Sequence, residues 1–507
     1  MPVSPVEGTS MATKLLLVLS CWAALGSAMP DPNYREYLIK TEKSQQTGGR
    51  VLLTNAEEQL SEVLQKMKQE EMESSEFPPA MHFFKAKPLI NHSSLFNLLR
   101  KMPKGGALHV HDFALVDVEW LVKNVTYRQH CYVCFTDDQS VRFIFSSHQP
   151  KPIPHCSEWI LLETVRAKID NTTDLDNSLI SNLTLYTDNP EAAYPNQDVV
   201  WKRFEETFLA AWGLVTYAPV FKDYFFEGLK RFNADNVMYL ELRALLPQTY
   251  ELNGTINDRF WTLRAYQEVL RQFVAEHSDF FGARVIFTAN RGINASQLKE
   301  VIEEAVKLQR EFPEIMAGFD LVGREDTGRP LWYFKEPLSL PEQLGVSLPY
   351  FFHAGETDFQ GTDVDQNILD ALLFNTSRIG HGFALVRHPT TKALSRKMGV
   401  AVEVCPISNQ VLKLVSDLRD HPAAVLMSEG HPLVISSDDP AIFGASGLSY
   451  DFYEAFVGIA GLTSGAGTLK ELAINSIRYS SLSPQQKEEA LSIWQKKWDK
   501  FVVENLP

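Results

Sequence analysis

Two histidines in an otherwise apolar stretch are the first residues that could do chemistry. Residues 102–113 read M-P-K-G-G-A-L-H-V-H-D-F, which places His109 and His111 on either side of one valine. If this stretch is a β-strand, both imidazoles point to the same side and face one spot. A buried imidazole needs a polar partner. The H-x-H pattern alone leaves two interpretations open, a pair of metal ligands and a pair of satisfied core histidines.

Further groups of the same kind end three later apolar stretches. His353 and Glu356 lie in F-F-H-A-G-E-T-D, His381 lies in R-I-G-H-G-F, and Asp438 and Asp439 lie in V-I-S-S-D-D-P. Three imidazoles and a carboxylate suit Zn²⁺ and leave one position for a water molecule, whose pKa the ion lowers toward neutrality. Glu356 and His381 then remain as acid and base groups. The four motifs together favour a hydrolytic zinc site over unrelated core histidines.

These motifs must be positioned by the strands that they end. Eight short apolar runs, mostly bounded by Gly or Pro, alternate with longer helical patterns, which is typical of parallel β/α architecture. The runs are Ala107–His111, Asn236–Arg243, Ala283–Thr288, Met316–Gly323, Pro349–Glu356, Ser377–Gly382, Val400–Pro406 and Pro432–Asp439. Eight of them predict an α/β fold with a (β/α)₈ TIM barrel over residues 103–123 and 185–507. The active site of such a barrel lies at the carboxyl ends of the strands, where all four motifs fall.

An N-terminal helical extension, residues 29–102, precedes the barrel. Apolar residues recur at helical spacing within Glu57–Met72, and the F-P-P sequence at 77–79 ends that pattern. A second helix is expected through Leu95–Leu99. The segment has too few apolar residues for a core of its own, so we expect it to dock on the barrel or on a second subunit.

A small inserted domain is predicted after the first strand, at about residues 124–184. Roughly ninety residues separate this strand from Val199, whereas a βα loop is usually far shorter. The motifs H-C-Y-V-C and H-C could form a zinc knuckle, but a disulfide is favoured in an oxidising compartment, and we predict Cys134–Cys156. Cys405, inside an apolar run, is expected to be a buried free thiol.

The first 28 residues resemble a secretory signal. Lys14 precedes the apolar run Leu15–Leu25, and small residues lead to a predicted cleavage after Ala28. The run is too short to span a bilayer, and no later stretch is long and apolar enough to do so. Seven N-x-S/T sequons accompany it, at Asn91, Asn124, Asn171, Asn182, Asn253, Asn294 and Asn375. We expect a secreted glycoprotein with glycans at Asn124, Asn171, Asn182 and Asn375, and a lysosomal destination stays open.

The net charge narrows the class of partner. The 507-residue chain carries a formal charge of -15 with a pI near 5.4. An acidic chain of this kind argues against nucleic acid or an anionic membrane as the main partner and fits a neutral or cationic small molecule.

The chemical motifs resemble those of a known family. The set H-V-H-D, H-A-G-E, R-I-G-H-G and S-S-D-D-P is similar to that of adenosine deaminases in the amidohydrolase superfamily. The signal, helical extension and glycosylated insertion further resemble the secreted adenosine deaminase-related growth factors. The resemblance covers almost all of the chain after the signal. It implies hydrolytic deamination of adenosine and 2′-deoxyadenosine to inosine and deoxyinosine, with release of ammonia.

The resemblance also implies a role for each site residue. One Zn²⁺ per subunit would be held by His109, His111, His353 and Asp438. Glu356 would protonate N1 of the purine, and His381 would orient the attacking water and take part in proton transfer. The implied substrate-binding residues are Asp112, Trp201, Glu205, Asn290, Gly323 and Asp439.

Two of these assignments have a competing interpretation or a departure from the family pattern. Trp201 lies in W-K-R-F-E-E-T-F, and amphipathic helices often carry such a tryptophan in the core. Asn290 follows the third strand, where close relatives carry histidine. That difference could alter substrate affinity or pH response but leaves the zinc chemistry intact.

The family finally implies a homodimer through the N-terminal helices and a receptor- or glycan-binding role for residues 124–184. Two alternatives remain, a secreted growth factor with a non-essential barrel and an amidohydrolase acting on another substrate. The fourth strand run, A-G-F-D-L-V-G, lacks the lysine whose carboxylated form marks binuclear hydrolases.

Overall fold

Two four-stranded parallel sheets form the centre of the protein in a computed structural model that describes residues 30–506. Their strand orders are β1-β5-β8-β9 and β10-β11-β12-β13. The strands are β1 (Gly105–His111), β5 (Val237–Ala244), β8 (Gly282–Asn290), β9 (Met316–Val322), β10 (His353–Ala354), β11 (Arg378–His381), β12 (Ala401–Val404) and β13 (Leu433–Ile435). Parallel bridges from Val110 to Asp438 and from Phe319 to Tyr350 join the two sheets at both edges. The eight strands therefore close into the predicted barrel.

Each strand run expected from the sequence contains a strand of the barrel, but the fifth is shorter than predicted. Within residues 349–356 only His353–Ala354 is a strand, and Tyr350 makes a single bridge to β9. The chain turns directly after Ala354 because Gly355 adopts a left-handed conformation with φ of +78°. This turn brings Glu356 back over the barrel mouth instead of continuing the strand.

Helices surround the barrel, and one of them lies across its mouth. They are α9 (Pro190–Ala193), α10 (Gln197–Val215), α11 (Ala218–Ala234), α12 (Arg259–Glu276), α13 (Ala295–Glu311), α14 (Lys335–Leu338), α15 (Leu340–Gln343), α16 (Asn367–Leu373), α17 (Pro389–Met398), α18 (Pro406–Val411), α19 (Ala423–Ser428), α20 (Ser449–Glu454), α21 (Ala466–Arg478) and α22 (Pro484–Glu504). A short hairpin pairs β6 (Thr249–Tyr250) with β7 (Ile256–Asn257). Helix α10 contributes one wall of the cavity above the strands.

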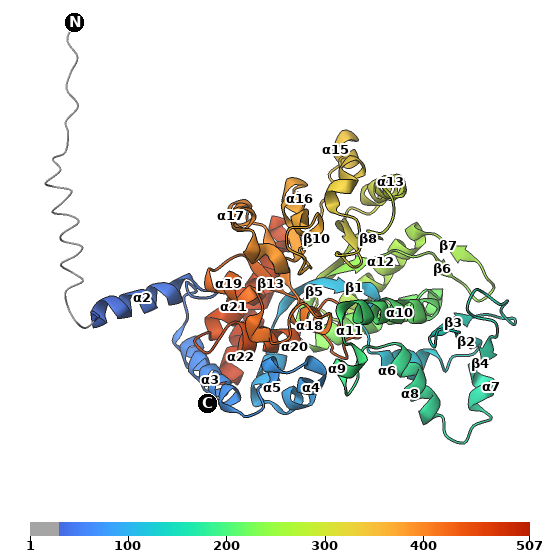
Figure 1. Cartoon of the computed structure of the whole chain (residues 1–507), viewed down its shortest axis with the longest axis horizontal. Helices are drawn as coiled ribbons and strands as arrows, with labels where there is room; N and C mark the ends of the chain where they lie inside the picture. The colour runs from blue at the N-terminus through green and yellow to red at the C-terminus, as the bar shows by residue number, and fades with distance from the viewer. Residues whose placement is uncertain (1–29, 507) are drawn as a thin grey trace, which may run out of the picture.

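The N-terminal segment is helical, as expected, and docks on the barrel. It contains α2 (Pro32–Gln45), α3 (Asn55–Glu73), α4 (Phe83–His92) and α5 (Ser94–Lys101). Helix α3 begins at a capping box between Thr54 and Glu57. The Glu57 carboxylate then accepts a hydrogen bond from Trp498 of α22 at 2.7 Å and pairs with Lys470 of α21 at 2.6 Å. Helix α2 has no buried residue and extends away from the rest of the molecule (Figure 1).

The insertion after β1 forms a small antiparallel sheet. Helix α6 (Val118–Trp120) precedes it. Its elements are β2 (Cys131–Phe135), β3 (Val141–Phe145), β4 (Ile160–Leu161), α7 (Leu162–Arg166) and α8 (Thr173–Asn182), with β2 in the middle of the sheet. It lies at the opposite end of the molecule from α2 (Figure 1). Strand β3 packs on α10 at Gly213, where a Cβ atom would lie 1.7 Å from the Phe143 carbonyl oxygen. Only glycine permits this approach.

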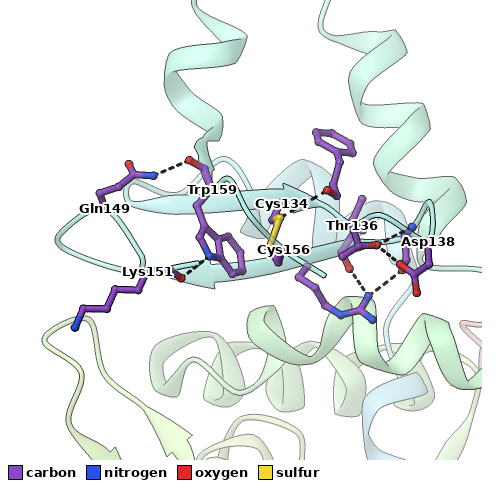
Figure 2. The surroundings of a disulfide bond; sticks show 11 residues. Cys134, Thr136, Asp138, Gln149, Lys151, Cys156 and Trp159 are labelled. Atoms are coloured by element: carbon purple, nitrogen blue, oxygen red, sulfur yellow. Dashed lines mark hydrogen bonds between the residues drawn. A yellow bond between two sulfur atoms is a disulfide. The ribbon is translucent and has the colours of Figure 1, made fainter. Parts of the chain in front are cut away.

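A disulfide joins Cys134 and Cys156, as predicted from the sequence (Figure 2). Its sulfurs lie in a small apolar cluster with Tyr132 and Trp159. The Trp159 indole donates a hydrogen bond to the Lys151 carbonyl at 3.0 Å, which ties the loop to the sheet. Because both sulfurs are bonded to each other, the alternative of a zinc knuckle is wrong. Cys131 and Cys405 are buried free thiols.

Three of the four asparagines predicted to carry glycans are exposed at the surface. Asn124, Asn171 and Asn375 are exposed, and Asn182 is half-buried. Among residues 30–506 no helix is long and apolar enough to cross a membrane. The predicted signal, residues 1–28, lies outside the described residues.

Candidate active site

Four side chains converge at the carboxyl end of the barrel. His109 and His111 come from β1, His353 begins β10, and Asp438 follows β13. One ligand atom from each lies within 4.8 Å of the others. The Asp438 Oδ1 atom is 3.2 Å from Nε2 of His109 and 3.1 Å from Nε2 of His111. The residues predicted from three separate motifs are thus brought to one point.

The orientation of two imidazoles tests whether this point fits a metal ion. Nδ1 of His109 is 2.7 Å from the Glu403 carboxylate, and Nδ1 of His353 is 2.6 Å from the Asp320 carboxylate. A carboxylate only accepts hydrogen bonds, so each Nδ1 carries a proton, and in the neutral imidazole each Nε2 then presents a lone pair. These two Nε2 atoms are 3.1 Å apart. Facing lone pairs repel unless a cation lies between them, as in the carboxylate–histidine–metal arrangement.

The donor set fits a metal ion in spacing as well as in charge. Tetrahedral Zn²⁺ with bonds near 2 Å separates its nitrogen ligands by roughly 3.3 Å, close to the 3.1 Å between the two Nε2 atoms. The Asp438 Oδ1 atom is buried and has no hydrogen-bond partner. The cluster therefore provides three imidazole nitrogens and a free carboxylate oxygen for one cation.

A buried network of charges lies beneath the cluster and was missed in the sequence. Arg243 bonds Asp320 and Glu403, each at 2.8 Å, and Arg378 bonds Glu403 at 2.6 Å and Glu241 at 2.7 Å. All five side chains are fully buried. The only signal in the sequence was a charged residue inside an apolar run, as in G-F-D-L-V and V-A-V-E-V. This network fixes the two carboxylates that orient His109 and His353.

Glu356 lies beside the cluster with an unpartnered carboxyl group. The backbone N–H groups of Gly355 and Glu356 donate to the Glu325 carboxylate at 2.8 and 2.6 Å, which holds the turn after β10 in place. Burial, followed by the negative charges of Asp438 and Glu325, raises the pKa of Glu356 well above its usual range. This raised pKa favours the protonated carboxyl group, which can donate a proton.

His381 completes the polar centre. Its Nε2 atom is 3.6 Å from Glu356 Oε1 and 3.8 Å from Asp438 Oδ2, and burial lowers its pKa well below the ordinary value. Both His381 and Asp438 have positive φ angles, 61° and 58°. Such backbone conformations are uncommon for residues other than glycine, and they aim both side chains into the mouth of the barrel.

A cavity of about 560 Å³ opens above the cluster. Its wall includes all six residues that the sequence assigned to the substrate, Asp112, Trp201, Glu205, Asn290, Gly323 and Asp439. The buried Asp112 accepts a hydrogen bond from the Tyr266 hydroxyl at 2.7 Å, and burial raises its pKa to about 7. Burial, followed by the charge of Asp438, also raises the pKa of Asp439, whose Oδ1 atom has no partner.

The residues on the outer wall differ in their exposure. Trp201 packs edge-on against Phe204 and remains 9% exposed, so it both belongs to the core and lines the cavity. Glu205, about one helical turn farther along α10, is exposed. Asn290 ends β8 beside Gly323, where a Cβ atom would lie 3.0 Å from the Asn290 amide nitrogen. The two roles considered for Trp201, a core residue and a substrate-binding residue, are therefore compatible.

Comparison with known families and proteins agrees with this geometry. The family model described as adenosine deaminase matches residues 181–497, and the one described as adenosine/AMP deaminase N-terminal matches residues 26–99. Adenosine deaminase 2-A of Danio rerio is 65% identical over 491 residues, 97% of either chain. Adenosine deaminase 2 of Homo sapiens is 51% identical over 505 residues, 98% of this chain and 99% of its own.

Solved structures of lower identity share the fold. The Arabidopsis ADAL protein in complex with IMP superposes with a TM-score of 0.55 at 19% identity, over 80% of this chain and 99% of that one. A Burkholderia ambifaria amidohydrolase with bound Zn has a TM-score of 0.55 at 16% identity, over 81% and 94% of the two chains.

Proposed function

The chain belongs to the adenosine deaminase family, and on this premise we propose that it catalyses zinc-dependent hydrolytic deamination of adenosine and 2′-deoxyadenosine. One observation supports this proposal above the others. Three imidazole nitrogens and a free carboxylate oxygen converge beside a buried neutral carboxyl group, at the base of a cavity of about 560 Å³. In the reaction the C6–N bond of the purine breaks, a C6–O bond forms with water, and ammonia leaves.

The residues of the cluster would hold one zinc ion per subunit. His109, His111, His353 and Asp438 supply the ligand atoms. When bound there, zinc lowers the pKa of a water molecule and makes it a nucleophile near neutral pH. Ser408 donates a hydrogen bond to Oδ2 of Asp438 at 2.7 Å, which leaves Oδ1 directed at the imidazoles.

Buried side chains, whose pKa values are shifted by burial, donate or transfer protons in the proposed reaction. Glu356, held neutral by burial, donates its proton to N1 of the purine and makes C6 more electrophilic. Asp439, whose pKa is also raised, offers a hydroxyl hydrogen to the N7 acceptor. His381 orients the attacking water and takes part in proton transfer, since its Nε2 lies within 4 Å of both Glu356 and Asp438.

The rest of the nucleoside would lie against the outer wall of the cavity. The Gly323 backbone contacts the base, because its left-handed conformation (φ +99°) and missing side chain leave the peptide accessible. Asp112, Trp201 and Glu205 line the side on which we place the ribose. Asn290 also lines this cavity and would affect affinity more than chemistry.

Turnover of adenosine tests the proposal. The purified protein with zinc should convert adenosine to inosine, followed by the loss of adenosine absorbance, and a chelator should abolish the reaction. Glu356→Gln should lower kcat by about 100-fold or more, whereas Glu336→Gln on the exposed surface of α14 serves as a matched control with full rate. Absence of turnover with zinc contradicts the enzymatic function, and turnover that resists the chelator contradicts the metal assignment.

The same proposal covers the setting in which the enzyme works. Residues 1–28 would direct secretion, with glycans at Asn124, Asn171, Asn182 and Asn375, three of which are exposed. Mass spectrometry of glycopeptides from secreted material tests both points. Protein that stays inside the cell without glycans contradicts them.

The two appendages of the barrel would serve association. Residues 29–102 would form a dimer interface, supported by the exposed side chains of Tyr34, Tyr37 and Leu38 on α2, a helix with no buried residue. Residues 124–184 would bind a receptor or glycan and carry growth-factor activity, and none of them lines the active-site cavity. Sedimentation of the intact protein tests the dimer, and cell binding by a variant without this insertion tests its role.

A further inference from the structure

The inner nitrogen of His381 is held differently from those of the other buried histidines at the site. His109 and His353 donate from Nδ1 to carboxylates. Nδ1 of His381 instead lies 3.1 Å from the side-chain amide nitrogen of Asn409, which follows β12 in helix α18. An amide nitrogen donates, so this contact reverses the usual direction of the hydrogen bond.

A second buried histidine determines which way the Asn409 amide faces. His421 accepts a hydrogen bond at Nδ1 from the Ala423 backbone N–H at 3.0 Å, and a backbone nitrogen can only donate. Burial lowers the pKa of His421 to about 3, so its single proton must be on Nε2. That proton is donated to Asn409 Oδ1 at 2.9 Å. The Asn409 amide nitrogen is therefore the atom that faces His381.

The opposite orientation of the amide is excluded by the same contacts. With Asn409 flipped, its amide nitrogen would face Nε2 of His421, which would then have to accept. The His421 proton would move to Nδ1 and face the Ala423 N–H, leaving two donors in contact. An unsatisfied buried donor costs roughly 1–3 kcal/mol. Only one arrangement satisfies all three hydrogen bonds.

From this chain of hydrogen bonds we infer that Asn409 and His421 are positioning residues that fix the tautomer of His381. With Nδ1 accepting, the one proton of His381 is on Nε2 and points toward Glu356 and Asp438. His381 thus meets the attacking water as a hydrogen-bond donor, and its Nε2 is not free to take a proton from that water. This inference rests on the proposed function for the role of His381 but not for its tautomer.

Substitution of Asn409 by its isosteric acid reverses the hydrogen bond. In Asn409→Asp a carboxylate oxygen replaces the amide nitrogen, so Nδ1 of His381 must carry a proton. We expect kcat to fall by about 100-fold or more, as when a catalytic histidine is held in the wrong tautomer, while KM stays within about threefold and zinc content is unchanged. Asn475→Asp, at another buried asparagine in α21, controls for the burial of a new acid.

Two substitutions of His421 separate hydrogen bonding from packing. Glutamine offers an amide NH₂ that can donate and a carbonyl oxygen that can accept, which can replace the donor and acceptor of neutral histidine, so His421→Gln should keep kcat within about threefold. His421→Leu fills the space without either group and frees the Asn409 amide to turn, so kcat should fall by about tenfold. Equal rates for these two variants would contradict the inference, even if Asn409→Asp does not fold.

The tautomer itself can be measured without turnover. In protein labelled with ¹⁵N at the histidine rings, the His381 signals are those lost in His381→Gln. We expect an unprotonated Nδ1 and a protonated Nε2 in the wild type, and a protonated Nδ1 in Asn409→Asp. A protonated Nδ1 in the wild type, or full kcat in folded Asn409→Asp, would overturn the inference. Failure of the proposed function would instead appear as no adenosine turnover with the expected ring signals intact.

Discussion

The floor of the barrel and the inserted domain keep their shapes by different means. Beneath the metal cluster, Arg243, Arg378 and Glu403 are fully buried, and each has at least two partners in one network. In the insertion, a three-stranded sheet is held by the Cys134–Cys156 disulfide and a cluster of a few apolar side chains (Figure 2).

This difference follows from what each region has to do. Histidine ligands must be held in one orientation, and buried carboxylates that are fixed by arginines hold the imidazole rings in place. Burying these charges has a high desolvation cost. The small insertion has little core, and a covalent bond stabilises such a unit by restricting its unfolded chain. We therefore expect the barrel floor to fail through loss of a charge and the insertion to fail through loss of its disulfide.

The largest effect is expected from Glu403→Gln. The change removes the charge that Arg243 and Arg378 share and leaves two buried cations short of a partner, which should cost about 3–5 kcal/mol of the free energy of unfolding. Urea unfolding followed by circular dichroism measures it. Glu206→Gln, which removes the partly exposed partner of Arg142 beside the insertion, should cost less than about 1 kcal/mol. Equal costs would contradict the comparison.

Removal of the disulfide should act on the insertion alone. In the double variant Cys134→Ser and Cys156→Ser, we expect the free energy for opening the insertion to fall by about 2–4 kcal/mol. Hydrogen exchange in peptides from β2 and β3 reports this opening. Because no residue of 124–184 lines the active-site cavity, kcat should stay within about twofold. A tenfold loss of kcat would show that the two regions are coupled.

A smaller effect is expected when the partner of one ligand is neutralised. Asp320→Asn weakens the acceptor for Nδ1 of His353 and should lower zinc affinity by about 10- to 100-fold. Competition against a chelator measures the affinity. Asp365→Asn, which alters the carboxylate partner of His388 away from the cluster, is the matched control and should leave the affinity unchanged. Loss of zinc in both variants would argue for a general destabilisation.

The smallest expected effect is a difference in the rate at which two buried thiols, one in each region, are alkylated. Cys131 lies in β2, and Cys405 follows β12. Burial raises the pKa of Cys131 to about 12 and that of Cys405 well above its usual value, so near pH 8 neither is a thiolate and both should resist alkylation in the native protein. Cys131 should react before Cys405 under mild denaturant, and sooner still without the disulfide. Simultaneous labelling would indicate a single cooperative unit.

Those parts of the structure that depend on local residue patterns could be predicted before folding was considered. Alternating apolar runs and helical patterns predicted the eight strands of the barrel, and the H-x-H spacing predicted two imidazoles on one face. The position of His109, His353, His381 and Asp438 at strand ends predicted their convergence, because parallel strands of a barrel end at one mouth. Cysteine spacing and an oxidising setting predicted the disulfide between Cys134 and Cys156.

The contacts between distant side chains could not be predicted in this way. Glu403 and Asp320 looked like isolated charges in apolar strands, and their bonds to His109 and His353 cross from one strand of the barrel to another. Asn409 lies in helix α18 and His421 precedes helix α19, so nothing in their spacing indicates the hydrogen bond between them. Residue spacing along one chain reports which face a side chain occupies, whereas its partner depends on how distant strands and loops pack.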